Sequence, residues 1–298
     1  MGEATALLGP FTLFLLMICV GLELSPADFR RVVAAPRAVI GGTLGQLAAL
    51  PLLTWVLVAV LEVPPIFGAG AVLVAVSPGA GISNVLVAAA GANIALSVTL
   101  TALASVLSVV TLPTVAAVGM RAFLGDAIEI EVPVGLIMLQ LALSLLLPIG
   151  LGMGLRARRP DFVAKHGRRL QSAAMGLIAL ILVVGIGASG GGGLDFEDAR
   201  AGFLAAGVWT LAAMLIGWTT AAALRLPPAD RFTFLIEFST RNIAVAAIVA
   251  MSGLGRLDLT LFSGAYVAVG YPLAFGAVAL RRWRGFPADP ARPPGAQA

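Results

Sequence analysis

A carboxylate, a guanidinium and an amide lie within six positions of one another in a stretch that is otherwise apolar. The segment RFTFLIEFSTRNIAVAAIVAMSGL, residues 231–254, carries Glu237, Arg241 and Asn242 near its middle. Charged side chains are costly inside a bilayer, and those found there usually face a bundle interior or mark the path of an ion or substrate. These three side chains are therefore candidates for a buried binding site.

The composition indicates that a bilayer surrounds this segment. Of 298 residues, 59% are apolar and 11% are charged, whereas soluble domains are about 25% charged. The mean hydropathy is +1.01. Apolar runs of roughly 20 residues, enough to cross the hydrocarbon core as a helix, recur along the chain. The sequence predicts an all-α polytopic protein with nine spans, at approximately 5–25, 38–61, 66–91, 94–120, 133–155, 170–189, 200–224, 230–253 and 257–280.

The loops between these spans are too short to fold alone. We therefore expect one membrane transport domain over residues 1–285, followed by a disordered cytoplasmic tail over 286–298 that is rich in proline. The first span lacks the basic start and the small-residue cleavage pattern of a signal peptide, so we expect it to be a helix of the domain.

Basic residues are distributed unevenly over the loops. Cytoplasmic loops collect Lys and Arg, and most of the nineteen basic residues fall in alternate loops. The largest group is in RARRPDFVAKHGRR, residues 156–169. The acidic clusters at 126–131 and 195–198 fall in the other loops. The sequence predicts an N-terminus outside and a C-terminus inside, in a cell inner or plasma membrane. The net charge of +4 then indicates attraction to anionic membrane lipid and no nucleic-acid partner.

Two of the nine segments are interrupted. The third, IFGAGAVLVAVSPGAGISNVLVAAAGAN, contains Pro78, Gly79 and Gly81, and the eighth carries the polar group described above. Backbone groups freed at membrane depth must be satisfied by protein, ions or water, so such breaks are candidate binding positions. We expect breaks near residues 78–82 and 237–241, crossing near the bilayer centre.

The positions of the two breaks predict an inverted repeat. Segments 5 to 9 form a five-helix set whose fourth member is broken, and segments 1 to 4 match such a set without its first helix. An odd number of helices per repeat inverts the second copy relative to the first. Paired breaks in inverted halves are typical of the binding site of a secondary transporter.

With these features the chain resembles the bile acid:sodium symporters over nearly its whole length, as a bacterial-type member with nine helices. The similar motifs are LLMICVGLELSPADF (15–29), GQLAALPLL (45–53), SPGAGISNVLVAAAGANIALSVTLTALASVLS (77–108) and EFSTRN (237–242). The resemblance implies a core domain of segments 3, 4, 8 and 9, with segment 2 leading in, and a panel domain of segments 1, 5 and 6, with segment 7 at the boundary. It also implies import of an organic anion, bile-acid-like or a small carboxylate or sulfonate, together with sodium.

The resemblance further implies two sodium positions and a substrate cavity near the helix crossing. The first position is formed by Ser83, Asn84, Ser97, Thr101 and Glu237. The second is formed by Gln46, Glu237, Phe238, Thr240 and Arg241. The cavity is placed at Pro78, Gly79, Asn84, Arg241 and Asn242.

The chemistry of the first set agrees with a sodium position. Ser97 and Thr101 are four residues apart and share one helix face. Asn84 adds an amide oxygen, the broken backbone near Ser83 adds carbonyls, and Glu237 supplies the balancing charge. The alternative is that these small polar residues only let helices pack closely, and that Gln46 is a simple interhelical hydrogen-bonding residue.

Arg241 departs from the family pattern, which has Gln at this place. A guanidinium about 4 Å from a bound sodium would repel it by roughly 4 kcal/mol at an effective dielectric of 20, on the order of a thousandfold in affinity. Arg241 follows Glu237 by four residues, so the two can pair if that stretch is helical. One hypothesis is that Arg241 replaces the second sodium beside Glu237. The other is that it faces the cavity and holds the substrate's anionic group.

Other classes of function account for fewer of these features. The single His166 and single Cys19 argue against a metal site, and scattered loop acids argue against a membrane enzyme. We therefore expect no enzyme activity, no cofactor apart from sodium as the coupling ion, and a monomer. A sodium-independent or proton-coupled organic anion carrier is the alternative, and a membrane sensor or structural protein without transport is a more remote one.

Overall fold

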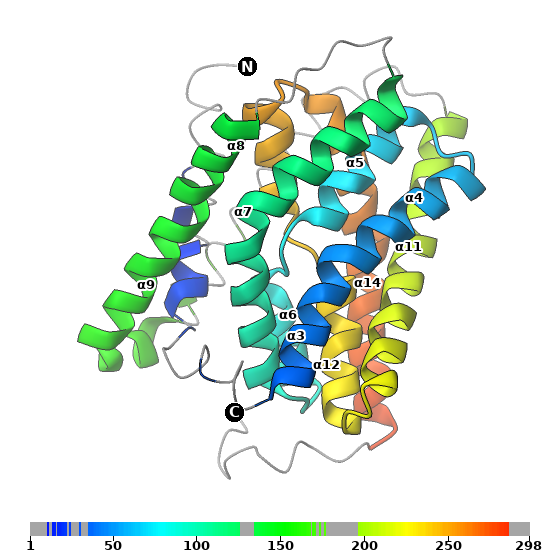
Figure 1. Cartoon of the computed structure of the whole chain (residues 1–298). Helices are drawn as coiled ribbons and strands as arrows, with labels where there is room; N and C mark the ends of the chain where they lie inside the picture. The colour runs from blue at the N-terminus through cyan, green and yellow to red at the C-terminus, as the bar shows by residue number, and fades with distance from the viewer. Residues whose placement is uncertain are drawn as a thin grey trace.

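The computed structural model describes residues 35–125, 134–167 and 196–285, together with scattered positions between 11 and 30 and between 169 and 176. The regular structure of this part of the chain is helical, apart from an isolated β-bridge (Figure 1). Five helices are long and apolar enough to cross a membrane: Pro36–Val60, Ile94–Leu124, Val134–Arg158, Glu197–Ala223 and Leu257–Trp283. Helices suit a bilayer because they satisfy their own backbone hydrogen bonds. The all-α prediction is confirmed.

Three of the long helices contain a π-helical or 3-10 turn. The first is built from α3 (Pro36–Leu44), the π-helical turn η1 (Gly45–Ala49) and α4 (Leu50–Val60). The third is built from α8 (Val134–Leu141), η3 (Ala142–Leu146) and α9 (Leu147–Arg158). The last begins with the 3-10 turn η5 (Leu257–Thr260) and continues as α14 (Leu261–Trp283). The other two are α7 (Ile94–Leu124) and α11 (Phe196–Ala223).

Two further helices are interrupted, as the sequence predicts. The first consists of α5 (Pro65–Val76) and α6 (Gly81–Ala89). The second consists of α12 (Pro228–Ser239) and α13 (Ile243–Ile248), which continues into the π-helical turn η4 (Val249–Gly253). Ser77 ends α5 in an extended conformation, with φ −63° and ψ 149°, because the following Pro78 disfavours helical geometry in the residue before it.

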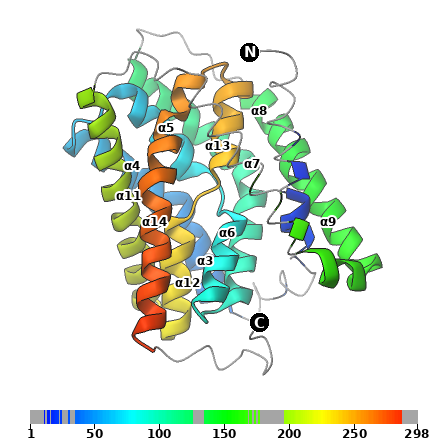
Figure 2. The ribbon, with the colours of Figure 1, turned by 180° about the vertical axis from the view of Figure 1, so that it is seen from behind.

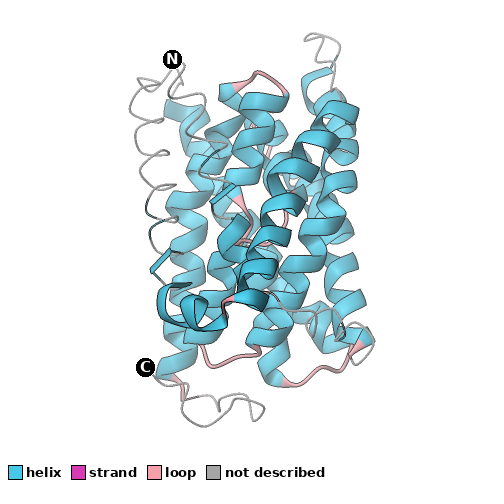
Figure 3. Ribbon diagram, turned by 90° about the vertical axis from the view of Figure 1, so that its left-hand side faces the viewer, coloured by secondary structure: helices cyan, strands magenta, loops and turns pink. Residues whose placement is uncertain are grey.

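The two interruptions lie against each other. Ala80 N donates to Thr240 O at 3.2 Å, and Asn242 N donates to Pro78 O at 2.9 Å. These bonds flank the β-bridge between Gly79 and Arg241. Figures 2 and 3 show the two loops at mid-height of the helix bundle. Each break therefore satisfies part of the backbone that the other leaves open.

The broken helices occupy the middle of the bundle. Every residue of α5 from Phe67 to Val76 is buried, as expected for a helix that is apolar on all sides. α11 packs against α12 and α14, and Gly217 of α11 permits the close approach, because a Cβ there would lie 2.5 Å from Phe234 O. Small residues at helix contacts are typical of membrane bundles.

Seven of the nine predicted segments correspond to described helices or helix pairs. The first predicted segment, 5–25, is described only at scattered positions, of which residues 17–22 are helical. The sixth, 170–189, lies outside the described residues except for isolated positions, and the predicted tail lies wholly outside them. Gly21 meets α9 at Gly152, since a Cβ on Gly21 would lie 2.9 Å from Gly152 Cα. The helix count, the inverted repeat and the division into core and panel remain predictions.

Candidate functional site

The carboxylate of Glu237 lies in the last turn of α12 and is completely buried. Its Oε1 lies 2.5 Å from the hydroxyl of Ser83 and also accepts a hydrogen bond from Ser97. Its Oε2 accepts a hydrogen bond from Thr101 at 3.0 Å. Ser97 Oγ also lies 2.8 Å from Asn84 Oδ1. The fold thus brings together, from α6, α7 and α12, all five residues predicted for the first sodium position.

The hydroxyl groups around this carboxylate have fewer hydrogens to donate than there are acceptor oxygens in contact with them. A serine hydroxyl carries one hydrogen, yet Ser83 Oγ faces both Glu237 and Ala80 O, the latter at 2.7 Å. Ser97 Oγ likewise faces both Glu237 and Asn84 Oδ1. Each hydroxyl can donate to one of its two acceptors, which leaves oxygens in contact without a hydrogen between them. A hard cation prefers such a set of carboxylate, amide and hydroxyl oxygens, so the cluster has the chemistry of a cation site.

Gly79 in the first break lies directly against this cluster. A Cβ built on it would lie 2.8 Å from Glu237 Oε2 and 3.0 Å from Thr101 Oγ1. The absence of a side chain here therefore leaves room beside the carboxylate that any other residue would fill. The break supplies this space and also a backbone oxygen, Ala80 O, next to the hydroxyl of Ser83.

Arg241 lies in the second break, and its side chain is completely buried. Its Nη1 donates to Gln46 Oε1 at 2.7 Å and to the backbone oxygen of Glu237 at 3.4 Å. Its Nη2 donates to the backbone oxygen of Ser77 in the first break. Gln46 belongs to η1, and π-helical turns are frequent at functional sites. The guanidinium therefore joins the two breaks to the α3–α4 helix.

The side chains of Arg241 and Glu237 do not form the ion pair that their spacing allows. Among the described residues, the ion pair present is Arg256 with Asp258, at 2.6 Å. The reason is that α12 ends at Ser239 and Thr240 is extended, with φ −115° and ψ 97°, so the helical four-residue relation does not hold. Arg241 turns toward Gln46 and Ser77, while Glu237 turns toward the hydroxyls.

Polar groups near the guanidinium retain unused hydrogen-bonding capacity. Arg241 Nε and Gln46 Nε2 are buried donors without a partner in the described part of the chain, and so is the hydroxyl of Thr43, three residues before Gln46. Buried polar atoms are usually satisfied, by water if not by protein. An additional hydrogen-bond acceptor, such as a water molecule or an oxygen of an anion, would satisfy the two donors Arg241 Nε and Gln46 Nε2.

The other predicted site residues have local roles. The ring of Phe238 stacks on Phe234, with centroids 5.6 Å apart. Thr240 donates to the backbone oxygen of Ile236. Asn242 caps α13 by accepting from Val245 N at 3.3 Å. Their side chains thus stabilise the second break, and their roles in a second cation position and in a substrate cavity remain predictions.

Two tyrosines in α14 support the second break, and the sequence interpretation did not include them. Tyr266 donates to Ser239 O and accepts from Arg241 N, the latter at 2.8 Å, and Tyr271 donates to Arg241 O at 3.1 Å. They are the only two tyrosines in the chain, and they lie five residues apart in an apolar helix. A buried tyrosine usually needs a partner for its hydroxyl, which is the signal that could have identified them.

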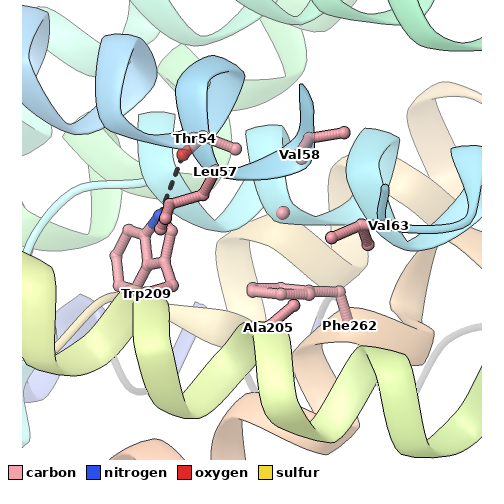
Figure 4. A pocket seen from close by; sticks show the side chains of 8 residues that line it. Thr54, Leu57, Val58, Val63, Ala205, Trp209 and Phe262 are labelled. Atoms are coloured by element: carbon pink, nitrogen blue, oxygen red, sulfur yellow. Dashed lines mark hydrogen bonds between the residues drawn. The ribbon is translucent and has the colours of Figure 1, made fainter. Parts of the chain in front are cut away.

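The structure also contains an apolar hollow away from this site, between α4, α5, α11 and α14 (Figure 4). Trp209 lines it and donates to Thr54 Oγ1 at 2.9 Å. It has room for about one water molecule, so it does not suit an organic anion. In the described part of the chain, no cluster of three or more His, Cys, Asp or Glu residues could bind a transition metal.

Comparison with known sequences connects this geometry to a protein family. The model of the Sodium Bile acid symporter family matches residues 10–191, more than half of the chain. The matched stretch contains the first break, with Ser83, Asn84, Ser97 and Thr101, and it ends before Glu237. The contacts of Glu237 with Ser83, Ser97 and Thr101 join the second break to the matched part.

Two curated relatives cover part of the chain. One, BASS1 of Arabidopsis thaliana, is described as a probable chloroplastic sodium/metabolite cotransporter and is 34% identical over 101 residues, which is 34% of this chain and 25% of that protein. The other, YocS of Bacillus subtilis strain 168, is described as an uncharacterized sodium-dependent transporter and is 36% identical over 104 residues, 34% of this chain and 32% of that protein. The chain therefore spans a third or less of the length of these relatives.

Proposed function

Because the chain belongs to the Sodium Bile acid symporter family, a family of multi-pass membrane transporters, we propose that it is a secondary active transporter that imports an organic anion together with sodium. The substrate is a bile-acid-like anion or a smaller carboxylate or sulfonate. The two breaks belong to inverted halves that cross in a core domain, and this core works against a panel domain that includes α8 and α9. The protein acts in a cell inner or plasma membrane with its C-terminus inside.

The observation that carries this proposal is the hydrogen-poor oxygen cluster around Glu237. Glu237 is fully buried, and no cationic side chain in the described part of the chain lies within ion-pairing distance of it. A buried carboxylate of this kind is costly unless a cation binds next to it. Sodium held by Ser83, Asn84, Ser97, Thr101 and Glu237 supplies that charge. The names of the two relatives, a sodium/metabolite cotransporter and a sodium-dependent transporter, support the same choice of ion.

The proposal is tested by uptake into proteoliposomes that contain the purified protein. Radiolabelled taurocholate and a set of smaller monocarboxylates are offered with an inward gradient of sodium, potassium or protons. We expect accumulation of at least one anion with the sodium gradient and none with potassium. Accumulation that follows the proton gradient would favour a proton-coupled carrier, and accumulation without a sodium or proton gradient would favour a sodium-independent carrier. No uptake of any anion would favour a sensor or structural protein.

We further propose that the guanidinium of Arg241 takes the place of a second sodium. The guanidinium donates to amide and carbonyl oxygens, which are also the ligands that a hard cation takes. These oxygens are Gln46 Oε1, Glu237 O and Ser77 O. The unpartnered Nε supports the rival role, in which Arg241 also binds the anionic group of the substrate.

Arg241→Gln separates these two roles. If Arg241 replaces a cation, the variant keeps uptake and its Hill coefficient for sodium rises by about one. If Arg241 binds the substrate, the sodium coefficient stays unchanged and substrate binding weakens by roughly 1.5–3 kcal/mol, since a charge-assisted hydrogen bond is lost. The measurement is sodium-dependent initial uptake by wild type and variant side by side. Arg281→Gln is the matched control, because Arg281 is also buried but contacts Ala90 O and Phe232 elsewhere.

A further inference from the structure

We propose that this transporter is electroneutral, moving one sodium with one singly charged anion, because its binding region contains its own positive charge in Arg241. This inference rests on the proposed function and adds to it the charge of the substrate and the response to membrane potential. It follows from the charges buried in the middle of the bundle and from how firmly each of them is held.

The buried charges of the described residues add up to zero around the breaks. The buried charged side chains in this part of the chain are Glu237, Arg241 and Arg281. Arg281 lies in the last turn of α14 and donates to Ala90 O, just past the end of α6, so it belongs to one end of the bundle. Of the described residues, one carboxylate and one guanidinium remain at mid-height, and without bound ions their charges cancel.

The guanidinium is a fixed charge that no transport step releases. Arg241 donates from two nitrogens to Gln46, Glu237 O and Ser77 O, which belong to three different elements. Its backbone is held as well, by Tyr266 at the nitrogen and by Tyr271 at the oxygen. A sodium ion in the same place would enter and leave in every cycle, whereas Arg241 stays with the protein in every state.

The net charge of the region then follows for each state of the cycle. With sodium bound at Glu237 the region carries one positive charge, contributed by the guanidinium. One monovalent anion returns it to zero. The binding region is therefore neutral both when empty and when fully loaded, and in neither state does it move net charge across the membrane when the site changes sides. A divalent anion would leave the loaded region negative, so we expect singly charged carboxylates or sulfonates to be preferred.

The same charges explain how sodium and anion would be coupled. Before sodium binds, Glu237 offsets Arg241 and the region attracts an anion weakly. Sodium neutralises the carboxylate and leaves the guanidinium uncompensated in a medium of low dielectric, where a nearby opposite charge is strongly favoured. The unpartnered donors Arg241 Nε and Gln46 Nε2 can then serve the oxygens of the anion or of a bridging water.

The test measures the response of uptake to membrane potential. Wild-type proteoliposomes receive a fixed inward sodium gradient, and a potassium gradient with valinomycin sets the potential at zero or at about −100 mV inside. The probe is taurocholate or whichever monocarboxylate of the uptake series the wild type accumulates with sodium. A carrier that moves one net positive charge accumulates its substrate about 50-fold more at −100 mV, from roughly 2.3 kcal/mol per charge. We expect less than a twofold change for wild type, and a sodium-to-anion flux ratio of one.

The outcomes distinguish this inference from the function on which it rests. Sodium-driven uptake that rises many-fold with the negative potential, or a flux ratio near two, would overturn electroneutrality and leave sodium symport in place. Uptake that shows no sodium dependence would overturn both. Arg281→Gln should respond to potential as wild type does, whereas Arg241→Gln, with a second sodium admitted, should become stimulated by the negative potential.

Discussion

Glu237→Gln removes the response of this protein to sodium. Sodium that binds only the folded protein stabilises it by mass action, by about 2.7 kcal/mol at a concentration of 100 times Kd. The glutamine side chain has the same shape but no negative charge, and its NH2 group brings two hydrogens into a cluster that is short of them. We expect the difference in Tm between sodium and potassium at matched ionic strength to disappear, and sodium-driven uptake to fall to the level measured without sodium.

Ser105→Ala is the control for this experiment. Ser105 is buried on α7 one turn beyond Thr101, but its hydroxyl donates to the backbone oxygen of Thr101 and not to Glu237. The variant should keep the sodium-dependent shift in Tm. If Glu237→Gln, purified as a monodisperse protein, were stabilised by sodium as much as wild type, Glu237 would not be a sodium ligand.

Gly79→Ala blocks the space beside the carboxylate and lowers the apparent sodium affinity at least tenfold. The added Cβ would lie 2.8 Å from Glu237 Oε2 and 3.0 Å from Thr101 Oγ1, so the carboxylate must move out of its place. Gly79 does not have a positive φ, and therefore alanine can adopt the same backbone conformation. The fold should survive, with the effect confined to the cation. Sodium titration of Tm and of uptake measures the affinity.

Gly150→Ala is the matched substitution for Gly79→Ala. Gly150 lies in α9, where a Cβ would have no neighbour within 4 Å, and alanine favours a helix over glycine by up to about 1 kcal/mol. This variant should bind sodium as wild type does and be equally or more stable. Equal sodium affinities for the two variants would show that the space at Gly79 is not used by the ion.

The sequence by itself determined the class of the protein and the places where its helices are interrupted. Long apolar runs must become helices in a bilayer, because no other open structure satisfies its own backbone there. Pro78 with Gly79, and the polar group Glu237 to Asn242, are incompatible with a plain membrane helix, so the breaks follow from local chemistry. The observed ends, at Val76 and Ser239, lie within a few residues of the predicted positions.

Only the tertiary structure decided which polar groups meet. The four-residue spacing of Glu237 and Arg241 suggested an ion pair, yet the extended backbone at Thr240 separates the two side chains and aims them at different partners. Tyr266 and Tyr271 also become part of the site only through packing of α14 against the second break. Such contacts depend on how helices distant in sequence are placed against one another, and the periodicity of a single helix carries no information about its neighbours.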